Sequence, residues 1–174
     1  KIEAVKYARE QHIPLFGLCL GLQMAVIEYS RNVLGLKDAN STEMNPNTKH
    51  PVIAIMDDQK AVEDYGGTMR LGAWDCNLKP GSKLAEIYGK TSISERHRHR
   101  YEVNNFYVKS LEEQGLICSG KNPKTGLIET IELKNHPFFV GVQFHPEYKS
   151  TVSNPHPIFF AFIKAAKEFN AQKQ

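Results

Sequence analysis

The sequence has few of the features that mark secreted, membrane-spanning or nucleic-acid-binding proteins. Only three of its 174 residues are cysteines, and Cys19, Cys76 and Cys118 lie too far apart for a CxxC metal site or a disulfide framework. No apolar run approaches the roughly 18 residues that a membrane helix needs, and no charged-then-apolar leader opens the chain. Basic residues outnumber acidic ones by only 22 to 19, which does not by itself indicate nucleic-acid binding. These absences favour a cytoplasmic protein that contacts neither membrane nor nucleic acid.

The composition that remains is that of one globular domain. Hydrophobic residues make up 41% of the chain and charged residues 24%, which is enough apolar material for a core. Apolar spacing predicts a helix over residues 2–11, a buried strand at Leu15–Cys19 and a second helix from about Met24 to Leu34. This helix–strand–turn–helix order is typical of an α/β sheet.

The rest of the chain is predicted to continue the sheet and to close with a helix. No repeat or linker interrupts it, and Gly66-Gly67 indicates a tight turn before an extended segment at 68–71. Further strands are expected at 52–56, 101–107, 115–118, 127–133 and 138–144, and a helix over 159–166.

A cysteine between two glycines follows the first predicted strand. Gly17-Leu18-Cys19-Leu20-Gly21 suits a nucleophile on a sharp strand-to-helix turn, because such a turn needs small neighbours. A helix N-terminus at Cys19 would favour the thiolate, and its free amides could hold an oxyanion. The alternative is a buried structural cysteine, since free cysteine is among the most buried residue types. The pentapeptide alone does not decide between them.

The segment Phe144-His145-Pro146-Glu147 supplies what a cysteine nucleophile would need. It follows a strongly apolar strand, so His145 would emerge at a strand end, where α/β sheets place their sites. A nucleophile requires a base and the base an orienting group, which Glu147 could provide. Alone, a His-Pro-Glu sequence is more often a surface turn. Together with the cysteine turn, it predicts a Cys-His-Glu triad.

The cysteine turn combined with a distant His-Pro-Glu resembles the class I (triad) glutamine amidotransferases. The segments 26–43, 66–72 and 95–105 resemble the CTP synthase branch of that class more closely than its GMP synthetase branch, and the resemblance runs through nearly the whole chain. It implies a three-layer α/β fold with a mostly parallel central sheet flanked by helices.

The resemblance also implies roles for individual residues in the hydrolysis of L-glutamine. Cys19 would attack the side-chain amide to form a γ-glutamyl thioester, with His145 moving the proton and Glu147 orienting His145. The residues that match substrate-binding positions are Leu20, which would supply an oxyanion amide, and Gln23, Glu43 and Arg100. A zwitterionic amino acid suits one anion and one cation, as Glu43 and Arg100 provide. Without the resemblance, Glu43 would be interpreted as a capping or solvent-facing residue.

The basic run Arg96–Arg100 has competing interpretations. It could bind phosphate or RNA, or His97 and His99 could bind a metal, although a third and fourth ligand are not visible and no metal site is expected. An internal network with Glu95 and Glu102 is favoured instead. Arg70 is a candidate for contact with an effector nucleotide or a neighbouring domain.

Two parts that the resemblance leads one to expect are not found in the sequence. No glycine-rich oxyanion loop precedes Cys19, and no synthetase domain for ATP, UTP and Mg²⁺ is present. Residues 1–174 are therefore expected to be a glutaminase domain truncated on its N-terminal side, with the first strands of its sheet missing and no cofactor of its own. In the full-length protein the resemblance implies GTP as effector and a homotetramer.

Two other classes of protein stay open at this point. One is a cysteine hydrolase of a similar fold, such as a peptidase. The other is a non-enzymatic regulatory or nucleic-acid-binding domain that uses Arg96–Arg100.

Overall fold

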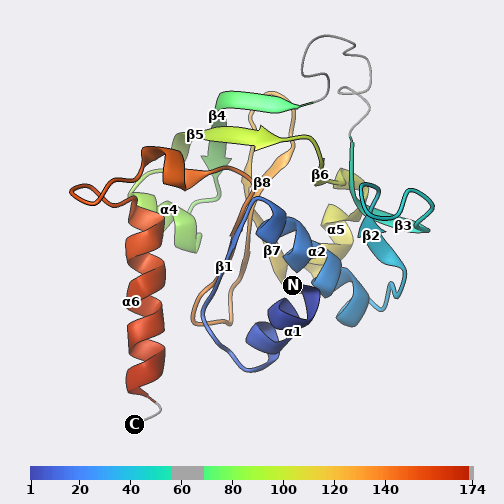
Figure 1. The fold of residues 1–174 in the computed structure, drawn as a ribbon, viewed down its shortest axis with the longest axis horizontal. Helices are drawn as coiled ribbons and strands as arrows, with labels where there is room; N and C mark the ends of the chain where they lie inside the picture. The colour runs from blue at the N-terminus through green and yellow to red at the C-terminus, as the bar shows by residue number, and fades with distance from the viewer. Residues whose placement is uncertain (56–68, 173–174) are drawn as a thin grey trace.

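A computed structural model describes residues 1–55 and 69–172 of the chain, and Figure 1 shows its two sheets and their helices. The main sheet has the strand order β1-β9-β8-β7-β4-β5, and a smaller sheet has the order β2-β3-β6. The strands are β1 (Leu15–Leu18), β2 (Ala39–Ser41), β3 (His50–Ala54), β4 (Arg70–Leu78), β5 (Ser92–His99), β6 (Glu102–Val103), β7 (Leu116–Lys121), β8 (Ile128–Leu133) and β9 (Phe139–Val142). The helices are α1 (Ile2–Glu10), α2 (Leu20–Asn32), α4 (Lys83–Tyr88), α5 (Val108–Glu113) and α6 (Pro157–Ala171), with 3₁₀ turns η1 (Asn105–Tyr107) and η2 (Pro146–Lys149).

Two hydrophobic cores on opposite faces of the main sheet define three layers. Strand β9 shows the division, because successive strand side chains point to opposite faces. Phe139 packs in the core that includes α1, α2 and α5, whereas Val140 and Val142 pack in the core that includes α4 and α6. Figure 1 shows α6 on the other side of β1 from α1 and α2. The predicted three-layer arrangement is therefore confirmed.

The main sheet is mixed rather than mostly parallel. Among the described strands only β1 and β9 pair in parallel; β9–β8, β8–β7, β7–β4 and β4–β5 are antiparallel. The prediction of a mostly parallel sheet was wrong for this part of the chain. For the pairs β7–β8 and β8–β9 the reason is the short connections at 122–127 and 134–138, which can return the chain only as hairpins, because a parallel pair needs a longer crossover.

Most predicted elements are present, with ends shifted by a few residues. The helices at both ends and the strands near 15–19, 52–56, 115–118, 127–133 and 138–144 are confirmed. The strand predicted at 101–107 is wrong, because only Glu102–Val103 is extended. The Asn104 side chain accepts a hydrogen bond from the amide of Phe106, which starts η1 and leads directly into α5. The turn predicted at Gly66-Gly67 lies outside the described residues.

No helix in the described part of the chain combines the length and the apolar character required to cross a bilayer.

The turn between β1 and α2 has little room and an unusual backbone. Cys19, the residue between the two elements, has φ 48° and ψ −100°, a region that non-glycine residues rarely occupy. A Cβ added to Gly17 would lie 2.8 Å from both the carbonyl carbon and the carbonyl oxygen of Gly21. A Cβ added to Gly21 itself would meet nothing within 4 Å. Only the first of these two glycines is therefore required by packing.

This difference predicts opposite results for two matched substitutions in the turn. Gly17→Ala should lower the free energy of unfolding by about 1–3 kcal/mol, because the new methyl group overlaps backbone atoms that cannot rotate away. Gly21→Ala, at the start of α2, should be neutral or stabilise the chain by up to about 1 kcal/mol. Urea unfolding of the two variants checks this, and equal losses would show that the turn is not packed as described.

Candidate active site

The parallel pair β1–β9 brings the cysteine and the histidine segments to one edge of the sheet. Leu18 pairs with Val142, so Cys19 and Gln143 both follow the carboxyl ends of adjacent parallel strands. The amide of Cys19 donates to the carbonyl of Val142 at 2.7 Å. Beyond β9, the amide of His145 donates to the carbonyl of Arg96 at 2.8 Å, which fixes the histidine segment against β5. The edge is thus of the kind at which α/β sheets bind ligands.

His145 and Glu147 form a hydrogen-bonded pair at this edge. Nδ1 of His145 lies 2.6 Å from Oε1 of Glu147, with Pro146 beginning the 3₁₀ turn that brings the carboxylate back to the ring. A carboxylate can only accept, so Nδ1 carries the proton and Nε2 of the neutral ring keeps its lone pair. Nε2 is buried and has no hydrogen-bond partner among the described residues. This arrangement suits a general base.

The sulfur of Cys19 is held as a thiol near neutral pH. The pKa of Cys19 is raised to about 11, mainly by burial, with smaller contributions in the same direction from the carboxylates of Glu102 and Glu147. The backbone amide of Leu20 and the side-chain amide of Gln143 act in the opposite direction, lowering the pKa. The helix N-terminus therefore contributes as expected, but burial outweighs it, and the sulfur needs a base to become nucleophilic.

An open cavity of about 470 Å³ lies beside Cys19 and collects every residue predicted to bind glutamine. Its lining includes Cys19, Leu20, Gln23, Glu43, Met69, Arg98, His99, Arg100 and Tyr101. Glu43 and Arg100 are both exposed and of opposite charge, as a zwitterion would require. Gln23 differs from the other three, because it is only 3% exposed and its amide is already hydrogen-bonded inside the protein.

Arg98 is a lining residue that the sequence did not single out. It lies two residues before Arg100, and along β5 every second residue is exposed, so Arg96, Arg98 and Arg100 alternate with buried residues. The alternation of arginine and histidine in the basic run was the signal that could have predicted that Arg98 and Arg100 lie on the same exposed face.

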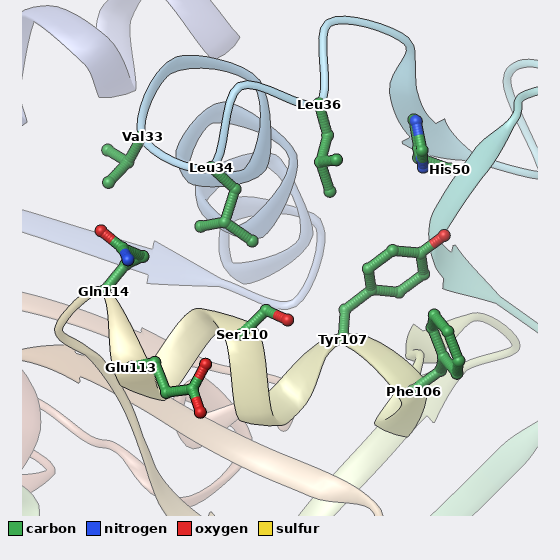
Figure 2. Close-up of a pocket in the computed structure, with 9 residues that line it drawn as sticks. All are labelled: Val33, Leu34, Leu36, His50, Phe106, Tyr107, Ser110, Glu113 and Gln114. Carbon is green, nitrogen blue, oxygen red and sulfur yellow. The ribbon is translucent and has the colours of Figure 1, made fainter.

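A second cavity, of about 530 Å³, contains none of the predicted site residues. Figure 2 shows it between the end of α2 and the η1–α5 segment. It is lined by Val33, Leu34, Leu36, His50, Phe106, Tyr107, Ser110, Glu113 and Gln114. Of these two cavities, the one beside Cys19 combines a nucleophile, a substrate-sized space and paired charges.

Arg70 lies inside the protein, where the structure contradicts its predicted contact with an effector or a neighbouring domain. It is 4% exposed, and its guanidinium contacts Glu102 at 3.0 Å and Glu129 at 2.6 Å. Burial raises the pKa of Glu102 to about 8, although Arg70 acts to lower it. Arg70 thus compensates two buried carboxylates.

The rest of this internal network comes from histidines rather than from the arginines of the basic run. His97 and His99 point inward and join each other through Nδ1 and Nε2 at 2.7 Å. His97 approaches Glu129 at 3.5 Å and His99 approaches Glu102 at 3.3 Å. Burial lowers the pKa of His97 to about 2 and that of His99 to about 3, so both rings are neutral. Glu95 belongs to a separate cluster with Lys149 and His156.

No group of three or more His, Cys, Asp or Glu side chains in the described residues is placed to hold a metal ion.

The buried network predicts that Arg70 is essential for stability. Arg70→Met should lower the free energy of unfolding by about 3–5 kcal/mol, because the buried side chains of Glu102 and Glu129 lose their cationic hydrogen-bond donor. The loss should grow as pH rises through about 8, since Glu102 has a folded-state pKa above its unfolded value and its deprotonation is then uncompensated. The exposed Arg98 provides the control: Arg98→Met should change stability by no more than about 0.5 kcal/mol. Denaturant titrations at several pH values measure both, and equal effects would contradict the network.

Comparison with known proteins gives the class to which this site belongs. Residues 1–165 match the family model described as "Glutamine amidotransferase class-I". The chain belongs to this family, and the class I amidotransferase fold implied by the resemblance is confirmed, with a mixed rather than mostly parallel sheet among the described strands.

Several curated relatives of high sequence identity are CTP synthases. The CTP synthase of Flavobacterium johnsoniae is 64% identical over 174 residues, covering 100% of this chain and 32% of the relative. A solved structure described as the glutaminase domain of Trypanosoma brucei CTPS with bound acivicin matches with a TM-score of 0.89 and 42% identity, over 96% of this chain and 65% of that one. A putative GMP synthase subunit from Thermoplasma acidophilum has a TM-score of 0.59 at 17% identity, covering 98% of this chain and 66% of that one, and shares the fold alone. The resemblance to the CTP synthase branch is thus confirmed, and the chain spans about a third of the length of its curated relatives.

Proposed function

We propose that this chain is the glutamine-hydrolysing part of a CTP synthase, with Cys19, His145 and Glu147 as its catalytic residues. The observation that carries the proposal is that Cys19 and a glutamate-oriented histidine share one sheet edge, next to a cavity lined by Glu43 and Arg100. The family membership and the CTP synthase relatives support the same conclusion.

The chemistry follows from the protonation states of these groups. Nε2 of His145 accepts the proton of the Cys19 thiol while the sulfur attacks the side-chain carbonyl carbon of glutamine. The resulting oxyanion is met by the backbone amide of Leu20, at the N-terminus of α2. His145 then returns the proton to the leaving nitrogen, so that ammonia departs and a γ-glutamyl thioester remains. Water, deprotonated by His145, hydrolyses the thioester to glutamate and regenerates the thiol.

The cavity supplies the means to hold the substrate. The carboxylate of Glu43 is assigned to the substrate ammonium, and the guanidinium of Arg100 to the α-carboxylate, for which its planar fork is suited. Leu20 and Gln23 line the same cavity.

The finer steps depend on partners outside residues 1–174. Ammonia is proposed to pass to a synthetase domain of the same polypeptide, which would use ATP and Mg²⁺ to aminate UTP to CTP. A glycine-rich segment upstream is proposed to add a second oxyanion donor. GTP as effector, a homotetramer and a cytoplasmic location belong to the same proposal.

Arg100 provides a test of substrate binding. In the full-length protein, Arg100→Ala should raise KM for glutamine about 10- to 100-fold, the value of a lost hydrogen bond to a charged group. Synthesis of CTP from ammonium salts should be unchanged. Arg100→Lys should recover only part of the loss, because an ammonium group cannot form the bidentate contact.

The neighbouring Arg96 is a matched control for this experiment. It is exposed on β5, four residues before Arg100, but does not line the cavity, so Arg96→Ala should leave KM for glutamine unchanged. An unaltered KM in Arg100→Ala would remove Arg100 from the substrate site.

The two halves of the proposed reaction can be separated at the nucleophile. Cys19→Ala in the full-length protein should abolish CTP formation from glutamine and retain it from ammonium salts, because the cysteine only releases ammonia. Cys19→Ser should fail almost as completely, since a hydroxyl is a much weaker nucleophile than a thiolate. Cys76→Ser and Cys118→Ser are the controls and should keep glutamine use, as both thiols are buried in the cores. Glutamine-dependent synthesis by Cys19→Ala would refute the assignment.

A further inference from the structure

A buried glutamine next to the sulfur has no role in the mechanism proposed above. Gln143, the first residue after β9, is 0% exposed. Its Nε2 lies 3.6 Å from Sγ of Cys19, and its Oε1 accepts a hydrogen bond from Nε2 of Gln23 at 3.4 Å. A buried amide of this kind is expected to have defined partners at both of its ends.

The partners of Gln23 determine which end of the Gln143 amide faces the sulfur. Nε2 of Gln23 also donates to the backbone carbonyl of Tyr101 at 3.0 Å. A carbonyl can only accept, so the NH₂ group of Gln23 must lie on this side. The group of Gln143 that faces Gln23 is then its oxygen. The NH₂ group of Gln143 is left pointing at Cys19, as a donor to the sulfur.

We propose that Gln143 is a positioning residue for the nucleophile: its side-chain amide orients Sγ of Cys19 and stabilises the negative charge that develops there as the proton leaves. Gln23 maintains the orientation of that amide from its anchor on Tyr101. The catalytic consequence rests on the proposed function, whereas the contact with the sulfur does not.

The charged surroundings of Cys19 explain why such a donor matters. Glu102 from β6 and Glu147 from η2 both disfavour the thiolate, and burial disfavours it more strongly. The groups that favour it are the backbone amide of Leu20 and the side chain of Gln143. In the proposed mechanism, His145, from the segment after β9, must take the proton from a thiol whose ionisation is on balance disfavoured. Loss of the Gln143 donor, one of these two, should therefore raise the pH at which the Cys19 sulfur becomes reactive.

The test follows alkylation of Cys19 by iodoacetamide as a function of pH in the full-length protein, with the Cys19 peptide quantified by mass spectrometry. Gln143→Met keeps the length of the side chain but cannot donate. Its alkylation profile should move to higher pH by about one unit, making the reaction about tenfold slower below the transition. Cys76 and Cys118 do not interfere, because burial raises the pKa of both thiols and their peptides are distinct. An unchanged profile in a folded Gln143→Met protein would overturn the proposal.

A second variant tests whether Gln23 orients the Gln143 amide, and it leaves the contact residue Gln143 unchanged. Gln23→Leu frees the Gln143 amide to rotate, so the profile should shift in the same direction by a smaller amount, about threefold in rate. This variant also decides the question if Gln143→Met does not fold. Gln114→Met, at an exposed position on a different cavity, is the control and should leave the profile unchanged. A shift of the alkylation profile in the control as large as in Gln143→Met would count against the proposed role of Gln23 and Gln143.

Glutamine turnover measured on the same variants separates this inference from the proposed function. In Gln143→Met, kcat for glutamine should fall about tenfold, with KM and ammonia-dependent synthesis little changed. A shifted alkylation profile in a protein that hydrolyses no glutamine would support the sulfur contact and reject the function. Normal glutamine turnover with no shift in Gln143→Met would reject the contact and leave the function standing.

Discussion

The parallel pairing of β1 with β9 is the constraint on which the candidate site depends. Register Leu18↔Val142 and the hydrogen bond from Cys19 to Val142 place two distant segments of the chain at one edge of the sheet. The same hydrogen bond anchors the turn in which Cys19 adopts a positive φ, and the absence of a side chain at Gly17 lets α2 begin directly against β1. The unfavourable backbone of Cys19 is thus held by its surroundings, as is common at functional sites.

The proposed mechanism combines a sulfur that resists ionisation with a histidine whose Nε2 can accept its proton. Burial raises the pKa of Cys19, whereas the hydrogen bond to Glu147 leaves Nε2 of His145 as the free acceptor. Proton transfer coupled to attack is the chemistry that fits this combination, rather than a preformed thiolate. His99 lines the cavity and contacts His97 and Glu102, so it connects the cavity to the buried Arg70 network.

Local signals predicted the parts of the site that are contiguous in sequence. The glycines around Cys19 and the sequence His145-Pro146-Glu147 could be recognised because each is a short segment at the end of an apolar strand. The strand order could not be predicted, since it depends on which connections are too short to cross over. Arg70 was misplaced because its partners, Glu102 on β6 and Glu129 on β8, come from strands that are distant in the sequence. Gln143 gave no local signal at all: in sequence it is one more residue at the end of a strand.

The central claim is that Cys19 carries the substrate as a thioester, and it can be tested by rapid acid quenching of the full-length protein during turnover of glutamine. The glutamine would contain heavy carbon throughout and heavy nitrogen in its side-chain amide. Peptide mass spectrometry should find the carbon label on the Cys19 peptide without the amide nitrogen, because ammonia leaves as the thioester forms. Turnover to labelled glutamate with no label on Cys19, or with the label on Cys76 or Cys118, would contradict this account.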